Sequence, residues 1–327
     1  MTTPLHTDEE FALLADNASE VRLPFDGRPV VARQAIALGD GRTASAIVWG
    51  TEPEVVFLHG GGQNAHTWDT VVLAMGRDAL AVDLPGHGHS DQARNPGEAV
   101  HDPVSMAEDV GVAIRTWAPR ARMVVGMSMG GLVGIVIGSR SPDLVRRLAV
   151  VDVTPGVTLA KAATMGRAAG PQPESFETLE EIVERTVASD PARSSSSLRR
   201  GVIHNTRQLP NGRWTWRHDH RPRDDEGFAL RADGSRYEPG APPDEPPPER
   251  DETAPLYPEL WEDVSALQAP TLLVLGSRSG VVDDEDRAEL LRRQPGARVV
   301  TIEGAGHRVQ GDQPIALATL LTEFLDR

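Results

Sequence analysis

The segment from Met123 to Leu132 constrains this chain more than any other, because a serine lies at its centre among closely spaced glycines. An apolar run ends at Gly126, Ser128 follows two residues later, and small apolar residues resume at Gly131. This order predicts a strand, a sharp turn and a helix, with the serine at the apex of the turn. Such a turn is strained and crowded, which accounts for the flanking glycines. The segment therefore predicts a nucleophile elbow around Ser128.

Short apolar runs alternate with helical stretches along most of the 327-residue chain. That alternation favours an α/β fold, a mostly parallel central sheet covered by helices on both faces. The runs that we interpret as strands are Glu20–Leu23, Ala44–Trp49, Val55–Leu58, Leu80–Val82, Met123–Met127, Leu148–Val151, Pro270–Gly276 and Ala297–Ile302. The stretches that favour helices are Ala65–Met75, Pro103–Trp117, Gly131–Ser139, Leu179–Ala188, Asp284–Arg293 and Pro314–Leu325.

The alternation stops after Pro155 and resumes at about residue 259. We interpret the intervening segment as a lid insertion that follows the strand ending at Asp152. It contains a hairpin signal at Asn211-Gly212 and a Pro- and acid-rich tract from Pro239 to Pro258. The sequence thus predicts an acidic N-terminal leader, a discontinuous core and a lid, at residues 1–18, 19–157 with 259–327, and 158–258.

The composition limits the classes of partner and the cellular location that we expect for this chain. The net charge of −15 argues against nucleic acid or an anionic membrane surface as a partner, since both attract basic patches. No cysteine is present, which excludes disulfides, thiolate metal sites and a cysteine nucleophile. The N-terminus lacks the pattern of a signal peptide, and no apolar run approaches the ~20 residues of a membrane span. We therefore expect a cytoplasmic protein that acts on a small molecule, with no membrane or nucleic-acid partner.

A serine nucleophile needs a base and an oxyanion site. His307 is the candidate base, because it follows a predicted strand in a glycine-containing loop late in the chain. Backbone N–H groups should stabilise the oxyanion, one from Met129 beside the nucleophile and one from the glycine-rich loop after Leu58. Within that loop we expect the N–H of Gly61. The loop lacks the pattern of a P-loop or a dinucleotide site, so no cofactor is expected.

Four motifs now occur together and in order: His59-Gly60-Gly61-Gly62, Asp83 to Ser90, Gly126 to Gly131, and Gly304-Ala305-Gly306-His307. With them the chain resembles the α/β-hydrolase superfamily of the serine-nucleophile type. The likeness spans residues 20–327 around a variable lid. HGGG and S-M-G-G resemble the branch that contains carboxylesterases, lactonases and the meta-cleavage-product hydrolases, which cut C–C bonds. The resemblance implies an α/β-hydrolase fold, acyl transfer and no cofactor.

One position departs from the family. The triad acid usually lies in the loop after the strand that ends near Leu275, and this chain has Gly280 at the expected place. Asp283 could reach back, although its position before a helix gives it a structural role as an N-cap. Asp152 could supply the carboxylate instead, as an acid at that strand end does in certain haloalkane dehalogenases. We favour Asp152; the remaining alternative is that no acid is present and activity is weak or non-hydrolytic.

The lid and the nearby loops offer candidates for a substrate pocket. Trp214 and Trp216 alternate, so both should face one side of a strand. With Trp68 and Gly62 they could line an apolar pocket, although packing of the lid on the core explains the tryptophans equally well. His218 and His220 flank Asp219 with the spacing of metal ligands. Because no further ligand cluster accompanies them, we interpret them as part of a polar lid strand and expect no metal.

Taken together, these residues predict a serine hydrolase that cleaves a small or medium apolar ester or lactone through an acyl-enzyme. Its expected catalytic residues are Ser128, His307 and Asp152. Two alternatives remain open: a C–C bond hydrolase or cofactor-free lyase on the same fold, and a non-enzymatic ligand-binding protein.

Overall fold

An eight-stranded sheet with the strand order β1-β2-β4-β3-β5-β6-β9-β10 forms the centre of the molecule. The computed structural model describes residues 10–27, 29–91, 102–164, 175–191, 193–218 and 251–327. β2 pairs antiparallel with β1 and with β4, and every other neighbouring pair is parallel. The strands are β1 (Val31–Ala37), β2 (Thr43–Trp49), β3 (Val55–Leu58), β4 (Ala79–Asp83), β5 (Met123–Met127), β6 (Leu148–Val151), β9 (Thr271–Gly276) and β10 (Arg298–Ile302).

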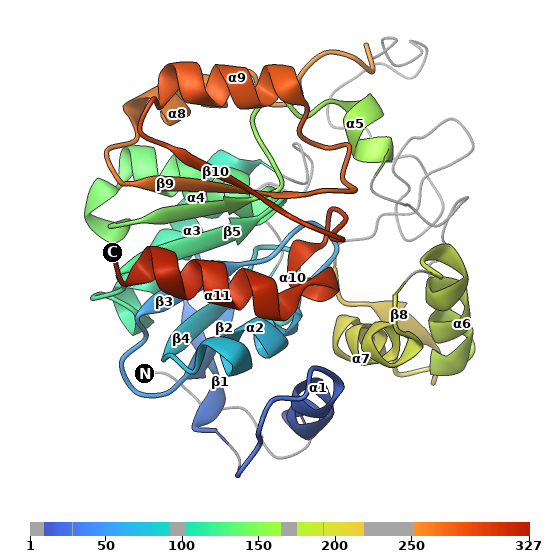
Figure 1. The fold of residues 1–327 in the computed structure, drawn as a ribbon. Helices are drawn as coiled ribbons and strands as arrows, with labels where there is room; N and C mark the ends of the chain where they lie inside the picture. The colour runs from blue at the N-terminus through green and yellow to red at the C-terminus, as the bar shows by residue number, and fades with distance from the viewer. Residues whose placement is uncertain (1–9, 28, 92–101, 165–174, 192, 219–250) are drawn as a thin grey trace.

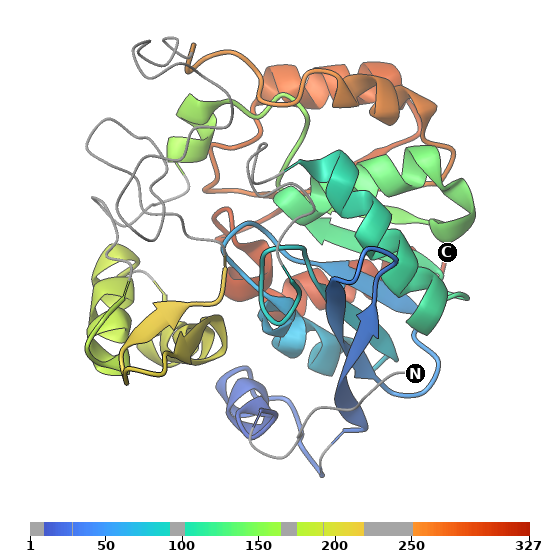
Figure 2. The same cartoon turned by 180° about the vertical axis from the view of Figure 1, so that it is seen from behind.

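Helices cover both faces of this sheet. In Figure 1, α11 crosses in front of the strands, and Figure 2 shows the teal and green helices α3 and α4 on the opposite face. The helices that pack on the sheet are α1 (Leu14–Glu20), η1 (Ala65–Trp68), α2 (Asp69–Met75), α3 (Pro103–Trp117), α4 (Met129–Arg140), α8 (Leu260–Ala266), α9 (Asp284–Arg293), α10 (Val309–Asp312) and α11 (Pro314–Leu325). A 3-10 turn, η2 (Pro142–Leu144), follows α4. The predicted α/β architecture is confirmed.

Two apolar clusters, one on each face, hold the layers together. Alternate residues of β3 contribute to the two clusters, because successive side chains of a strand point to opposite faces of the sheet. Val56 and Leu58 join the cluster under α3, α4 and α8. Val55 and Phe57 join the cluster under α2 and α11. The central strands are therefore buried on both sides, and the site must lie at their ends.

The first strand differs from the prediction. Glu20–Leu23 is not a strand, since α1 ends at Glu20 and a turn follows; the edge strand is β1. The sequence pattern does not indicate a strand at β1, because the buried side chain of this strand is a cation, Arg33. The Arg33 guanidinium forms ion pairs with Asp83 and with Glu10 and a hydrogen bond to Ser45. A buried charge is tolerated only when paired in this way, and sequence periodicity does not reveal its partners.

The described part of the predicted leader packs against the core. Phe11 and Leu14 are buried in the cluster under α2 and α11, and α1 contacts α2. Residues 10–20 therefore belong structurally with the core, whereas residues 1–9 lie outside the described residues.

Between β6 and α8 the described part of the chain forms five further elements. They are α5 (Leu159–Ala163), α6 (Leu179–Ser189), α7 (Ser195–Asn205), β7 (Thr206–Gln208) and β8 (Trp214–Trp216). Figure 1 shows α6, α7 and β8 gathered at the side of the sheet where β10 ends and α10 begins. β7 and β8 pair antiparallel across Asn211-Gly212, which confirms the predicted hairpin. Most of the Pro- and acid-rich tract lies outside the described residues.

Among the described residues, no helix has the length and apolar character required to cross a membrane.

Candidate active site

Ser128 sits at the junction of β5 and α4 in a strained backbone conformation, with φ +52° and ψ −121°. The surrounding glycines make room for it. A Cβ on Gly126 would come within 2.1 Å of the Gly130 carbonyl oxygen, and a Cβ on Gly130 within 2.3 Å of the Leu58 oxygen. Neither contact is sterically possible, so the tight turn requires glycine at both positions. Ser128 itself remains partly exposed at the carboxyl end of the strand.

His307 and Asp152 meet at this same end of the sheet. Asp152 follows β6, and His307 lies in the loop between β10 and α10. The His307 Nδ1 lies 2.8 Å from Asp152 Oδ2. Because an ionised carboxylate only accepts hydrogen bonds, Nδ1 carries the proton, which leaves Nε2 free to act as a base. The structure thus brings together two of the residues that the sequence singles out.

The Asp152 carboxylate is buried, with 1% of its side chain exposed, and further donors surround it. The Gly276 N–H donates to Oδ1 at 3.0 Å, and the Ser279 hydroxyl donates to Oδ2. The backbone of Asp152 is also in the left-handed region, at φ +56°. With the His307 ring, three donors thus satisfy the oxygens of this buried side chain and fix its position. Ser279 is a site residue that the sequence analysis missed; it lies directly before Gly280, in the loop that usually carries the acid.

Asp283 is engaged elsewhere. Its side chain accepts the Asp286 N–H at 2.9 Å and so caps α9, and it forms an ion pair with Lys161 at 2.9 Å. Burial opposes ionisation, but the hydrogen bonds from the Asp286 backbone and Lys161 outweigh it and lower the pKa of Asp283. Its side chain makes no contact with His307 within the part of the chain that the structure describes.

The His59-Gly60-Gly61-Gly62 loop lies directly beside Ser128. A Cβ on Gly60 would lie 3.2 Å from the Ser128 Cβ, and the Gly130 N–H donates to the His59 carbonyl. The His59 ring is fully buried and neutral, since burial lowers its pKa. Its Nε2 accepts the Leu84 N–H, so Nδ1 donates to the Gly60 carbonyl at 2.8 Å. His59 thereby orients the peptide between Gly60 and Gly61.

Two amide groups near Ser128 have no acceptor among the residues that the structure describes. The Gly60 N–H donates to Gln63 Oε1 and the Gly62 N–H to His87 Nε2, each at 3.0 Å. Across the residues that the structure describes, the N–H groups of Gly61 and Met129 have no protein acceptor. In a trans peptide the N–H points opposite to the preceding carbonyl, so the Gly61 N–H points away from His59.

The predicted pocket residues fall into different environments. Trp68 is 0% exposed and packs on Phe57 in the core, with ring centroids 4.9 Å apart. This burial contradicts a role for Trp68 in lining an accessible substrate pocket. Trp214 and Trp216 pack beside Phe176 in the apolar cluster of the inserted elements. Packing within the core thus accounts for Trp68, and packing within the inserted elements for Trp214 and Trp216, whereas the expected alternative was packing of the lid on the core.

His218 reaches the His59–Gly62 loop from the end of β8. Its Nε2 lies 3.9 Å from the position that a Cβ on Gly62 would occupy, and its ring packs against Trp216 and His87. Gly62 therefore lies near both the core and the insertion. Asp219 and His220 lie outside the described residues, so their predicted spacing has no structural counterpart here.

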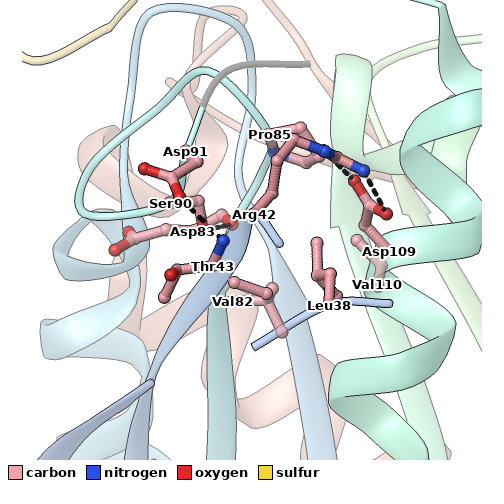
Figure 3. Close-up of a pocket in the computed structure, with 11 residues that line it drawn as sticks. Leu38, Arg42, Thr43, Val82, Asp83, Pro85, Ser90, Asp91, Asp109 and Val110 are labelled. Carbon is pink, nitrogen blue, oxygen red and sulfur yellow. Dashed lines mark hydrogen bonds and ion pairs between the residues drawn. The ribbon is translucent and has the colours of Figure 1, made fainter. Parts of the chain in front are cut away.

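A small pocket opens on the other side of the β4 loop, between the β1–β2 hairpin and α3. Figure 3 shows it closed on one side by Arg42, whose guanidinium forms two hydrogen bonds to Asp109, at 2.6 and 3.0 Å. It has room for about one water molecule. Ser128, Asp152 and His307 are not among its lining residues, so this pocket is not a substrate site for them.

The chain belongs to the α/β-hydrolase family: the model of the alpha/beta hydrolase family matches residues 55–320. Among its relatives is "Esterase Rv0045c" of Mycobacterium tuberculosis (strain ATCC 25618 / H37Rv), 42% identical over 97% of this chain and 96% of that protein. A crystal structure of that esterase superposes with a TM-score of 0.76 at 40% identity and covers 99% of this chain and 100% of the other. The chain is accordingly a hydrolase, and the similarity supports ester hydrolysis.

More distant relatives share the fold. The "sn-1-specific diacylglycerol lipase ABHD11" of Mus musculus is 26% identical over 84% of this chain and 81% of its own length. The crystal structure of E-2-(acetamidomethylene)succinate hydrolase superposes with a TM-score of 0.69 at 21% identity, over 91% of this chain and 100% of that one. This last likeness shows the fold alone.

A second cluster of titratable groups fastens α7 to the core. His66, Asp69 and His204 bring potential ligand atoms within 4.8 Å of one another. Nevertheless, both His66 nitrogens already contact carboxylates, Asp69 at 2.8 Å and Glu10 at 3.0 Å. The His66 and His204 rings are stacked 3.7 Å apart, so one ion could not lie in the plane of both. We therefore interpret the cluster as an ion-paired joint rather than a metal centre.

Replacing His66 with phenylalanine should destabilise the protein by about 3 kcal/mol near pH 6, because a buried carboxylate loses its partner while the ring stacking remains. Burial opposes protonation, but Asp69 and Glu10 raise the pKa of His66 to about 9. The unfolded value is ~6.5, so this stabilisation is complete below that pH and is lost as the pH rises through about 9. Denaturant unfolding at pH 6 and pH 10 measures both effects.

The exposed pair between Arg120 and Glu52 provides the control for this measurement. Arg120→Gln should cost less than about 1 kcal/mol at either pH. Equal costs for His66→Phe and Arg120→Gln, or a cost for His66→Phe that does not diminish at pH 10, would contradict the ion-paired joint.

Proposed function

We propose that this chain is a serine esterase that hydrolyses a small or medium apolar ester or lactone through an acyl-enzyme. The observation that carries the proposal is the 2.8 Å contact between His307 Nδ1 and the buried Asp152 carboxylate, at the sheet end that also bears Ser128. It supplies an oriented base at the sheet end that also carries a serine on a strained turn, the combination that acyl transfer requires.

Acylation in this scheme begins with the Ser128 hydroxyl, which attacks the acyl carbon while its proton passes to His307 Nε2. The Asp152 carboxylate stabilises the resulting imidazolium. The N–H groups of Gly61 and Met129 stabilise the negative charge on the former carbonyl oxygen. His307 then returns the proton to the departing alcohol oxygen as the C–O bond breaks.

Deacylation repeats these steps with water. His307 accepts a proton from the water as its oxygen attacks the acyl-enzyme, and the proton then returns to the Ser128 oxygen as the acid leaves. Each residue is used twice, and no cofactor enters the scheme.

Residues 158–258 act as a lid in this proposal. The support comes from contacts of α7 with Asn64, two residues after the His59–Gly62 loop, which is the oxyanion loop of this proposal. The Asn64 amide donates to the His204 carbonyl at 2.9 Å and to Asn205 Oδ1 at 2.7 Å. The lid would thus limit which acyl groups reach Gly62 and Ser128.

Product analysis tests the reaction class. Incubation with p-nitrophenyl acyl esters, with aliphatic lactones and with a vinylogous diketone should yield acid from the first two and leave the diketone intact. Cleavage of the diketone alone would favour the C–C hydrolase. Saturable binding of all three without any product would favour the ligand-binding protein.

A further inference from the structure

His87, in the turn after β4, holds the His59–Gly62 loop through a side-chain hydrogen bond. The Gly62 N–H donates to His87 Nε2 at 3.0 Å, and the other ring nitrogen, Nδ1, lies 3.0 Å from the Pro85 carbonyl oxygen. An N–H must donate and a carbonyl oxygen must accept. These two partners therefore determine the state of the ring: His87 is neutral, with its proton on Nδ1 and the lone pair of Nε2 directed at Gly62.

The turn that carries His87 is itself rigidly attached to the same loop. The buried Asp83 carboxylate accepts the Ala65 N–H at 2.8 Å and the His89 N–H at 3.0 Å. Ala65 begins η1 directly after the oxyanion loop, so one carboxylate joins both segments. His87 is 1% exposed, which gives its ring little freedom to move.

The hydrogen bond from Gly62 to His87 matters because it helps to fix the direction of the neighbouring Gly61 N–H. Gly62 is in the left-handed region at φ +73°, and its N–H is turned toward His87. His59 orients the peptide between Gly60 and Gly61 through the Gly60 carbonyl, as described above. With the peptides on both sides of the Gly61 Cα held in this way, the Gly61 N–H has one preferred direction.

We propose that His87 is a positioning residue of the oxyanion site, and that its neutral Nε2 keeps the Gly61 N–H aligned for the transition state. The inference rests on the proposed serine-esterase function. His87 touches neither substrate nor the reacting atoms; it acts through Gly62. Its contribution should therefore be realised when charge develops on the substrate oxygen, and not when the neutral ester binds.

Three substitutions separate this role from simple packing. His87→Gln places an amide oxygen near the position of Nε2 and keeps an acceptor for Gly62. His87→Asn is also polar but too short to reach Gly62, and His87→Met fills the space without a comparable acceptor. We expect kcat to fall about 10- to 100-fold in the Asn and Met variants, with KM within about threefold of wild type, and to fall less than about fivefold in the Gln variant.

The inhibition constant of an alkyl trifluoromethyl ketone gives a second readout, since its adduct with Ser128 would carry an oxyanion. It should rise in parallel with the loss of kcat/KM across the three variants. If His87→Met does not fold, the Gln and Asn variants decide the matter alone, because both are polar and differ in reach.

Equal kcat losses in the Gln and Asn variants would overturn the inference, and so would losses confined to KM. Full turnover in His87→Met and His87→Asn would overturn it as well, and would leave the proposed function intact as long as Ser128→Ala is inactive. Turnover retained in Ser128→Ala would instead refute the proposed function itself.

Discussion

Ester turnover is expected to fall by on the order of 10⁵-fold when Ser128 is replaced with alanine, because the acyl-enzyme can no longer form. The backbone at this position has φ +52° in the structure, and alanine accepts that strain about as well as serine does. The variant should therefore fold normally. Steady-state kinetics with a p-nitrophenyl ester, together with a thermal melt, measure the two properties separately.

Ser139 offers a matched control for this experiment, since it lies on α4, the helix that directly follows Ser128, and its hydroxyl donates to Asp263 at 2.7 Å. Ser139→Ala removes the same atom far along the helix and should keep wild-type turnover. Comparable turnover in both serine variants would show that Ser128 is not the nucleophile.

The acid should be identified by a second pair of variants. Asp152→Asn is expected to lower kcat by about 10³- to 10⁴-fold at neutral pH. The reason is the tautomer: an amide NH₂ facing His307 would donate to Nδ1 and leave the ring proton on Nε2. His307 could then no longer accept the Ser128 proton. The change is isosteric, so the hydrogen bond from the Gly276 N–H can remain.

Asp283→Asn is the counterpart of this variant. Asparagine is also a favourable N-cap, so α9 should remain intact and kcat should stay within about twofold of wild type. Kinetics of both variants side by side distinguish the two carboxylates. The assignment of Asp152 is wrong if Asp283→Asn abolishes turnover and Asp152→Asn does not.

Much of the core could be predicted because its elements are either uniformly apolar or strongly amphipathic. The predicted Pro103–Trp117, Asp284–Arg293 and Pro314–Leu325 coincide with α3, α9 and α11. Two of these helices, α3 and α9, begin after a residue that is a favourable N-cap, Asp102 and Asp283 respectively. The failures have a common physical cause. β1 buries a paired arginine and shows no apolar period. α7, which is missing from the predicted helices, is rich in serine and arginine and shows none either.

The site was predictable to the extent that each residue belongs to a local motif. The turn around Ser128 and the loop of His307 are visible in the sequence because glycines flank them. The roles of Ser279 and His87 are not visible, because each depends on a partner that is distant in sequence: Ser279 donates to Asp152, and His87 accepts from Gly62. Only the strand order places those partners side by side.

The most direct test of Ser128 as the nucleophile is covalent labelling of the folded protein with an alkyl fluorophosphonate, read by intact mass and by peptide mapping. We predict one phosphonyl adduct per chain, on Ser128, formed at least about 100-fold more slowly in Asp152→Asn and not at all in Ser128→Ala. An adduct on another residue, or no adduct on folded protein, would contradict the assignment of Ser128 as a nucleophile activated by His307 and Asp152.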